Sequence, residues 1–138
     1  MKKDDCIFCK VVDKTIASPI FYEDDKTLVF LDKNPVNMGH SLVIPKEHFV
    51  NIHDTPEEIL SHMIKVAKKI AKIVKLGTNA DGINVHVNNE KAAGQAVFHT
   101  HIHIIPRFEN DGFTNWESRK NYSPDEDKKL AQKFSSML

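Results

Sequence analysis

At 138 residues the chain is long enough to bury a hydrophobic core, and we expect one domain over residues 1–138 with a tail from about residue 108. Its 19 Lys and Arg residues balance 19 Asp and Glu residues, so the formal net charge is zero. This balance argues against a nucleic-acid polymer or an anionic membrane as partner, but it is compatible with a small phosphorylated ligand.

The N-terminal segment predicts a cytoplasmic protein with a short helical turn over residues 6–14. We find no secretory signal, and no run approaches the roughly 20 apolar residues of a membrane span. Cys6 and Cys9 are the only cysteines. A CxxC pair in a reducing compartment suggests metal or redox chemistry rather than a disulfide framework, and two packed, reduced cysteines are the alternative.

Three short strands are predicted next. Residues 20–23 and 27–31 favour extended structure and are separated by turn residues at 24–26, which indicates a hairpin. Residues 40–44 predict a third strand, which Pro45 ends.

The following segment predicts one long amphipathic helix. Thr55 is placed to cap its N-terminus, Pro56 takes the first helical position, Glu58 completes a capping box and Gly77 ends the helix. Its lysines are expected to be solvated rather than to bind nucleic acid. Apolar residues at steps of three and four predict one buried stripe: Ile59, Met63, Val66, Ile70 and Ile73.

Two more strands and a tail helix complete the prediction. Residues 82–88 alternate strictly, and a hairpin with a histidine-rich strand at 99–105 would bring Asn88 and Gln95 close to the histidines. A tail helix is expected to begin near Ser123. Its apolar residues are expected to be buried: Leu130, Phe134 and Met137. The predicted fold is α+β, an antiparallel sheet of about five strands with one long helix, a short N-terminal helix and a C-terminal helix.

Three histidines alternate with other residues at His99, His101 and His103. In an extended strand their rings would share one face, with neighbours about 7 Å apart at a rise of about 3.3 Å per residue, so one small anion could touch all three. A buried imidazole row is unfavourable unless each ring is hydrogen-bonded or used, which favours chemistry or metal binding over a purely structural role. A pure metal site would normally recruit carboxylates or further histidines, and the strand offers none adjacent.

The segment from His99 to Ile105 resembles the pattern His-φ-His-φ-His-φ-φ of the histidine triad family, with polar Thr100 in the first φ position. Residues 94–98 and 39–48 resemble other sequence blocks of that family. The resemblance extends from Cys6 to about Trp116 and is strongest to bacterial members of the nucleotide-binding, HINT-like branch, which implies a HIT-like fold.

This resemblance implies hydrolysis or transfer at a nucleotide phosphorus atom, with a purine nucleoside phosphoramidate or an adenylated compound as substrate. His101, the middle histidine, would be the nucleophile. Its neutral ring nitrogen would attack the α-phosphorus and displace the leaving group, and water would then cleave the nucleotidyl-histidine and release the nucleoside monophosphate. A backbone carbonyl would hold the other ring nitrogen as a donor, and no catalytic metal is required.

Further roles carry over position by position from the family. His99 completes the triad, and His103 and His40 correspond to histidines that touch phosphate oxygens or assist the leaving group. Asp32 corresponds to the acidic residue that accepts the ribose hydroxyls, although alone it would read as ordinary surface. Ala96 stands where many relatives carry a hydroxyl, so the leaving-group preference is expected to differ.

The remaining nucleotide positions are partly apolar. Phe8 and Phe30 correspond to residues that sandwich the purine, although from the residues alone both could equally be core aromatics. Asn88 and Gln95 correspond to polar phosphate-binding positions, and Val97 to a nucleotide contact.

The CxxC pair supplies half of a tetrahedral zinc site. Relatives with this pair complete the site with two histidines, which correspond here to His48 and His99. The resemblance thus implies a structural Zn²⁺ bound by Cys6, Cys9, His48 and His99, which would tie the N-terminal segment to the sheet without entering the chemistry.

Relatives usually join two subunits edge to edge in one continuous sheet, so the resemblance implies a homodimer. Trp116 and the tail would cover the partner's nucleotide site, or else the tryptophan packs on its own tail. His53, His62 and His86 carry no motif and are interpreted as ordinary, although alternation places His86 on the face of Asn88.

Several alternatives stay open. Within enzymes the protein could be a dinucleoside polyphosphate hydrolase. It could also be a nucleotide-binding regulatory module with incidental hydrolysis, or a metalloenzyme that uses the histidine row as ligands. The transferase branch fits less well, because its third triad position is usually glutamine and here it is His103. AMP-like and GMP-like purine nucleotides are both candidate ligands.

Overall fold

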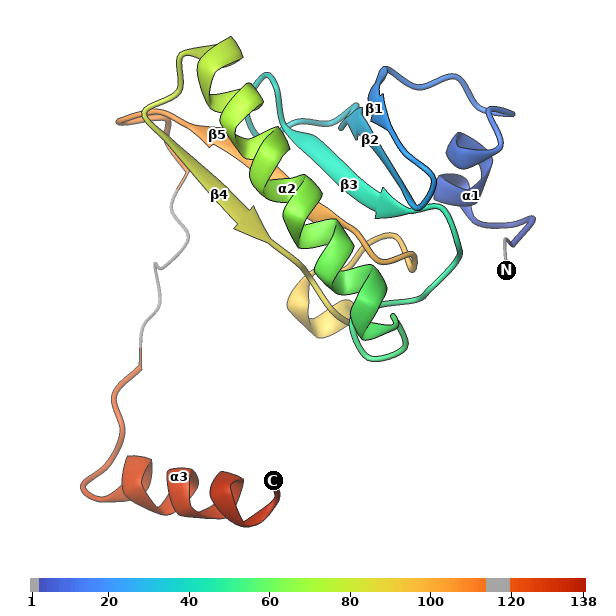
Figure 1. Cartoon of the computed structure of the whole chain (residues 1–138). Helices are drawn as coiled ribbons and strands as arrows, with labels where there is room; N and C mark the ends of the chain where they lie inside the picture. The colour runs from blue at the N-terminus through green and yellow to red at the C-terminus, as the bar shows by residue number, and fades with distance from the viewer. Residues whose placement is uncertain (1–2, 114–119) are drawn as a thin grey trace.

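The computed structural model describes residues 3–113 and 120–138, and its elements follow the predicted order (Figure 1). The helices are α1 (Ile7–Val12), α2 (Glu57–Thr78), the 3-10 helix η1 (Lys91–Ala93) and α3 (Glu126–Ser136). The strands are β1 (Ile20–Glu23), β2 (Thr27–Leu31), β3 (Ser41–Pro45), β4 (Gly82–His86) and β5 (Ile102–Arg107). Within these ranges the strands form a five-stranded antiparallel sheet in the order β1-β2-β3-β5-β4, which confirms the α+β prediction.

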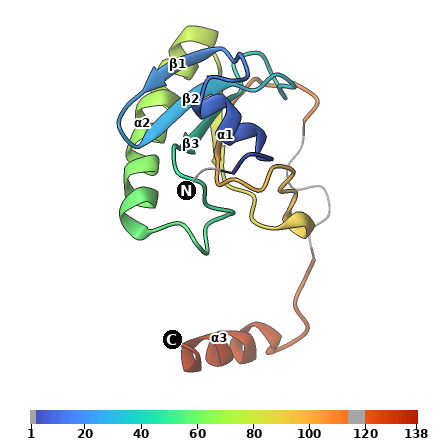
Figure 2. The ribbon, with the colours of Figure 1, turned by 90° about the vertical axis from the view of Figure 1, so that its right-hand side faces the viewer.

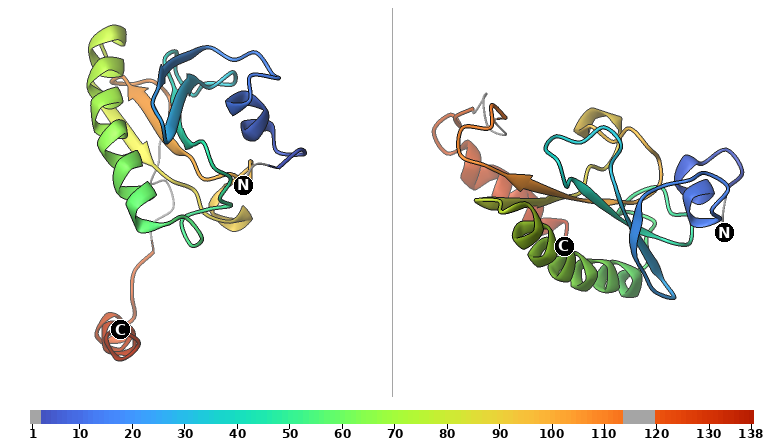
Figure 3. Two further views of the ribbon diagram at one scale, coloured as in Figure 1. Left: turned by 45° about the vertical axis from the view of Figure 1, so that its right-hand side comes forward. Right: turned by 90° about the horizontal axis from the view of Figure 1, so that it is seen from above.

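The sheet separates two apolar layers. Because successive strand residues point to opposite faces, β2 and β3 contribute alternate side chains to each layer. Val29 and Val43 pack with the buried stripe of α2, whereas Phe30 and Leu42 pack with α1. Figures 2 and 3 show α2 along one face of the sheet and α1 on the other. The layer under α1 also contains Cys6 and Cys9, which brings the N-terminal segment to the face where the histidines lie.

Helix α2 buries the predicted stripe with one exception. Ile59, Met63, Val66 and Ile70 are buried as expected, but Ile73 is 51% exposed and Val74 is buried in its place. Ala67 is buried as well, so the face that meets the sheet is centred on the side of Ala67 and Val74, and Ile73 lies at its opposite margin.

Both predicted ends of α2 need correction. The Thr55 hydroxyl does not cap the helix, because it donates to the Asn51 carbonyl at 2.7 Å and also meets the Thr100 hydroxyl at 2.8 Å. At the other end the helix passes Gly77, and Asn79 takes the left-handed conformation (φ 57°) that ends it. Asparagine tolerates this conformation better than most side chains.

The tail departs most from the prediction. Helix α3 begins at Glu126 and lies apart from the sheet in Figure 1, and none of its residues is buried. The expected burial of Leu130, Phe134 and Met137 is therefore wrong for this chain alone. Trp116 lies outside the described residues. Among the helices of the described ranges, none has the length and apolar character needed to cross a bilayer.

Candidate functional site

The three motif histidines do not form one row. Strand β5 begins only at Ile102, so the alternation of a strand does not apply to the residues before it. Instead the Thr100 N–H donates to the Phe49 carbonyl at 2.7 Å and holds this segment against the loop after β3. His99 points to the cysteines, whereas the His101 and His103 ring centroids lie 4.8 Å apart. The expectation that one anion touches all three rings is thus wrong.

His101 is held with one ring nitrogen free. Its Nδ1–H donates to the His99 carbonyl at 2.6 Å, so the proton of the neutral ring is on Nδ1 and Nε2 keeps its lone pair. Burial lowers the pKa of His101, which keeps the ring neutral near pH 7. A buried neutral imidazole with a free Nε2 is equipped to act as a nucleophile.

His40 and His103 form a hydrogen-bonded pair with defined proton positions. The Val36 N–H donates to His40 Nδ1 at 3.1 Å, so the proton of the neutral His40 ring is on Nε2. That Nε2–H donates to His103 Nδ1 at 2.9 Å, which leaves the His103 proton on Nε2. Burial lowers the pKa of His40, and burial with the nearby histidines lowers that of His103 to about 3. Both rings are therefore neutral near pH 7.

His86 joins this group, although its sequence context suggested no role. It lies directly opposite His103 on β4, and the two rings face each other with centroids 4.8 Å apart and planes 33° apart. Burial lowers the pKa of His86. The alternation that places His86 on the face of Asn88 was the available signal, but the partner strand and register were needed to identify its contact with His103.

A cavity of about 360 Å³ opens beside His101 and His103. Of the residues predicted to bind a nucleotide, the following line it: Phe8, Phe30, Asp32, Asn88, Val97 and His103. Ala96, Lys33 and Asn34 also border it, and the last two were not predicted. His40 and Gln95 are not among the lining residues, but His40 contacts two residues that are, His103 and Asp32.

Two predicted nucleotide contacts have a different geometry from the one expected. Phe8 and Phe30 meet edge to face with centroids 5.5 Å apart and planes at 75°. A purine between two parallel rings needs about 7 Å, twice the carbon contact distance, so these rings do not form a sandwich. The Gln95 amide donates to the carbonyls of Val50 and Val97, and its oxygen accepts from the Glu90 N–H. Gln95 thus shapes the loop at the cavity.

A second cluster lies next to the cavity. Cys6, Cys9, His48 and His99 each offer one ligand atom, all within 4.8 Å of one another. His99 Nε2–H donates to the Pro45 carbonyl at 2.9 Å, so Nδ1 keeps its lone pair and lies 3.4 Å from Cys6 Sγ and 3.6 Å from Cys9 Sγ. A tetrahedral zinc ion separates its nitrogen and sulfur ligands by about 3.5 Å. The cluster can therefore hold a metal ion.

Asp32, His40 and His103 also lie within ligand distance of one another. His40 Nε2 lies 3.7 Å from Asp32 Oδ2. However, the Val36 N–H places the His40 proton on Nε2, the atom that would have to bind the ion. A metal ligand needs a lone pair at that nitrogen, so the proton arrangement disfavours a metal at this triad.

Comparisons with known proteins show which proteins this chain resembles. A model of the HIT domain matches residues 13–110. Adenylylsulfatase HINT3 of Arabidopsis thaliana is 41% identical over 96% of this chain and 68% of its own length. Adenosine 5'-monophosphoramidase HNT1 of Candida albicans is 42% identical over 74% of this chain and 70% of its own. The crystal structure of a zinc-bound histidine triad family protein from Mycobacterium smegmatis, 38% identical, matches with a TM-score of 0.76 over 96% of this chain and 97% of that one.

Proposed function

The chain belongs to the HIT domain family, and on that premise we propose that it cleaves at the α-phosphorus of purine nucleoside phosphoramidates or adenylated compounds. Relatives named as an adenylylsulfatase and an adenosine monophosphoramidase support hydrolase activity in general. Their names share an adenylyl group and differ in the group attached to it. We therefore assign this chain's specificity to the nucleotide and leave its leaving group open between an amine and an oxyanion.

The observation that carries this proposal is the orientation of His101. Its Nδ1–H is bound to the His99 carbonyl, and the ring borders the cavity with Nε2 free. A neutral imidazole attacks phosphorus without a metal, and the cationic ring of the intermediate keeps its Nδ1–H hydrogen bond to the carbonyl. This contact is local and preorganised, so it is in place before substrate binds.

The proposed reaction has two displacements at phosphorus. The His101 Nε2 lone pair forms a bond to the α-phosphorus, the bond to the leaving group breaks, and the leaving group takes that electron pair. An amine leaving group also takes a proton from solvent, whereas an oxyanion leaves without one. Water then forms a bond to the same phosphorus, the phosphorus–Nε2 bond breaks, and the lone pair returns to Nε2. The proton lost by the water goes to solvent, and the nucleoside monophosphate leaves. His103 Nε2–H donates a hydrogen bond to the phosphate oxygen or the leaving group in this scheme.

The polar groups at the cavity rim suit the remainder of a nucleotide. The Asp32 carboxylate borders the cavity and accepts the Asn34 N–H through Oδ1, which leaves Oδ2 for the ribose hydroxyls. Asn88 also borders the cavity, and we assign its side-chain amide to the phosphate. Phe8 and Phe30 supply an apolar wall for the base rather than two parallel faces.

We assign the Cys6, Cys9, His48 and His99 cluster to a structural Zn²⁺. The ion would cross-link the α1 segment to the residues before β5 and take no part in the reaction. His99 would bind it through Nδ1 while its carbonyl holds His101, so one residue connects the metal site to the nucleophile.

We also assign this chain a homodimer joined through the free edge of β4. In the described part of the sheet β4 is an edge strand, and it exposes Val85 (43%). An apolar edge strand of this kind is suited to pairing with a second copy of itself.

A trapping experiment tests the proposed reaction. The purified protein and His101→Ala are incubated with a fluorogenic adenosine phosphoramidate and, separately, with adenylyl sulfate, each with and without chelator. We expect turnover and a mass increase of one nucleoside monophosphate in the wild type, neither of them in His101→Ala, and no loss of the adduct with chelator. Tight nucleotide binding without adduct or turnover would instead favour a regulatory module, and loss of turnover on brief chelation would favour a metalloenzyme.

A further inference from the structure

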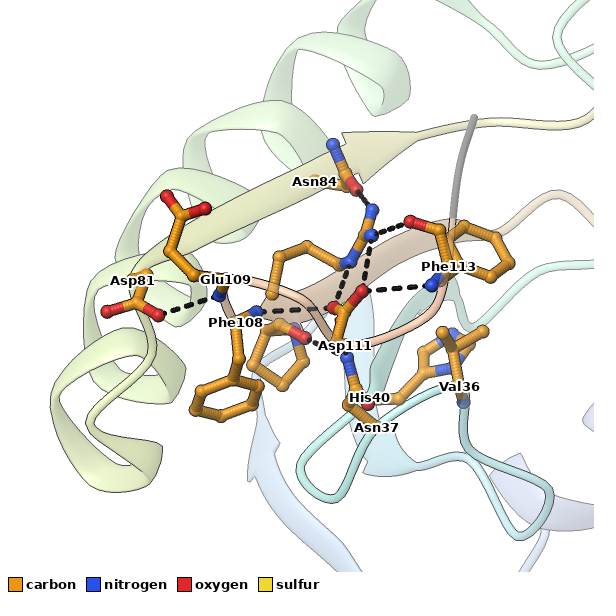
Figure 4. A network of polar contacts seen from close by, with 11 residues as sticks. Val36, Asn37, His40, Asp81, Asn84, Phe108, Glu109, Asp111 and Phe113 are labelled. Atoms are coloured by element: carbon orange, nitrogen blue, oxygen red, sulfur yellow. Dashed lines mark hydrogen bonds and ion pairs between the residues drawn. The ribbon is translucent and has the colours of Figure 1, made fainter. Parts of the chain in front are cut away.

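A charged cluster outside the cavity connects the end of β5 to the loop between β2 and β3 (Figure 4). The Asp111 carboxylate accepts two hydrogen bonds from Arg107, from Nε at 2.7 Å and from a terminal nitrogen at 2.9 Å. It also accepts the N–H groups of Phe108 and Phe113. The other terminal nitrogen of Arg107 donates to Asn84 Oδ1 at 2.6 Å on β4. A planar bidentate pair of this kind fixes geometry as well as charge.

Asn37 connects this cluster to the loop. Its side-chain nitrogen donates to Asp111 Oδ2 at 3.0 Å and to the Pro106 carbonyl at 2.9 Å. Its own carbonyl accepts the His40 N–H at 3.0 Å. The neighbouring residue, Val36, provides the N–H that His40 Nδ1 accepts. Asn37 thus anchors the loop segment that presents the Val36 N–H.

We propose that Asp111, oriented by Arg107, is a positioning residue that acts through Asn37 and Val36 to keep the His40 proton on Nε2 and hence the His103 proton on Nε2 at the cavity. The inference rests on the proposed function, because His103 Nε2–H serves there as a donor to the phosphate or leaving group. Among the described residues, Arg107, Asp111 and Asn37 do not line the cavity, and the hydrogen bonds named above connect them to His40 and His103.

The proton arrangement of the pair depends on one hydrogen bond. A neutral imidazole carries its proton on either nitrogen, and the partner of the other nitrogen selects the tautomer. If the Val36 N–H moves away, the His40 proton can transfer through water from Nε2 to Nδ1. His40 Nε2 would then be an acceptor 2.9 Å from the His103 Nδ1 acceptor.

Two facing acceptors repel, so His103 would respond by moving its own proton from Nε2 to Nδ1. His103 would then present an unprotonated Nε2 to the cavity, and this lone pair would face phosphate oxygens that are also acceptors. The pair would keep its internal hydrogen bond with reversed direction, but the site would lose the donor. We therefore expect the variants to lose catalytic rate and to stay folded.

Nitrogen NMR of the histidine side chains tests this directly. Long-range spectra of ¹⁵N-histidine-labelled protein distinguish the two tautomers of each ring without any substrate. We compare the wild type with Asn37→Ala and Asp111→Asn. The matched control is Asp81→Ala, which removes a carboxylate that accepts the Glu109 N–H at 2.9 Å in the same turn but does not reach Asn37.

We expect Nε2–H tautomers of His40 and His103 in the wild type and in Asp81→Ala, and Nδ1–H populations in the other two variants. We also expect kcat to fall by about ten- to a hundredfold with little change in KM, the size typical of a displaced catalytic group. Thermal melts establish that each variant is folded. Asn37→Ala keeps the Arg107–Asp111 pair, so it still tests the proposal if Asp111→Asn does not fold.

Unchanged tautomers in folded Asn37→Ala would overturn the proposal, as would changed tautomers with an unchanged kcat. If the wild type has no turnover at all, the proposed function fails on that ground. The tautomer comparison of wild type and variants then still decides whether the cluster positions His40.

Discussion

At the scale of single residues, the position of one proton on each ring decides what the histidines can do. The His99 carbonyl frees Nε2 of His101, and the Val36 N–H places a proton on Nε2 of His40. His103 takes its proton arrangement from His40. Three rings of the same chemical type thus receive different roles, because each has a different backbone or ring partner.

The donor role of His103 predicts a strong effect of His103→Phe. The phenyl ring keeps the contact with His86 but has no Nε2–H, so we expect kcat to fall by about a hundredfold with the fold retained. Steady-state kinetics with the phosphoramidate measure this. His86→Phe is the matched control, since it keeps the ring contact and leaves the His103 donor in place. A kcat of His103→Phe close to that of the wild type would contradict the donor role.

The lowered pKa of His103 predicts how stability depends on pH. Burial lowers this pKa to about 3 from 6.5, so between these values the unfolded chain binds a proton that the folded chain does not. The stability that His103 contributes is therefore present above about pH 6.5 and is lost as the pH falls toward about 3. We expect the melting temperature of His103→Phe to fall less than that of the wild type between about pH 7 and about pH 5. His53→Asn, at an exposed position, should behave as the wild type.

Asp32 offers a test of nucleotide binding. Because its Oδ2 is assigned to the ribose in substrate and transition state alike, Asp32→Asn should raise KM by about ten- to a hundredfold with little change in kcat. Asp25→Asn, an exposed carboxylate in the turn between β1 and β2, should change neither. A fall in kcat alone would argue against the ribose contact.

At the scale of elements, the site depends on two short segments, α1 and the loop between β2 and β3, which are stabilised by contacts with the rest of the fold. Helix α1 has six residues, too few to be stable alone, and it is held by burial against the sheet and by the contacts of Cys6 and Cys9 with His48 and His99. The loop between β2 and β3 is held in turn by Asn37 and Asp111. The position of this loop, which borders the cavity at Asp32, thus depends on the cluster around Asp111.

Removal of the proposed Zn²⁺ should show how far α1 depends on the contacts between the cysteines and the histidines. We expect chelation to lower the melting temperature of the wild type by at least about 5 °C, because a ligand that binds only the folded state stabilises it. Cys9→Ser should begin at the lower value and show no further change with chelator. Metal analysis should give about one zinc per chain for the wild type. An equal response of both proteins to chelator would contradict a zinc site at Cys9.

At the scale of the whole molecule, the strand order brings the parts of the site together. β5 lies between β3 and β4, so His103 has Leu42 on one side and His86 on the other. The same order leaves β1 and β4 at the edges of the described sheet. The face of the sheet that carries His86 and His103 therefore extends to the free edge of β4.

The free edge predicts a second copy of the chain. Light scattering after size exclusion should give twice the chain mass for the wild type, and Val85→Lys should shift the protein toward the monomer, because charge on an edge strand opposes strand pairing. Phe21→Lys on the opposite edge strand is the control, at a position that is 44% exposed. A monomeric wild type would contradict the dimer.

The sequence by itself determined the order of the longer helices and strands and several residues of the cavity. Burial follows the period of a helix or strand, so α2 and the strands could be predicted from their apolar residues. The motif around His101 identified the family, and residues next to it along the chain, such as Ala96 and Val97, form one part of the cavity wall. These are local signals, so they can be recognised in the sequence without knowledge of the fold.

Only the tertiary structure decided the directions of the side chains and the positions of the protons. His99 and His101 separate because the strand starts after them, and the Thr55 hydroxyl turns to Thr100 instead of capping a helix. Asn37 and Asp111 are 74 residues apart in the chain, yet one hydrogen bond joins them. No local pattern specifies such a bond, because its two partners become neighbours only when the strands pair and bring the distant loops together.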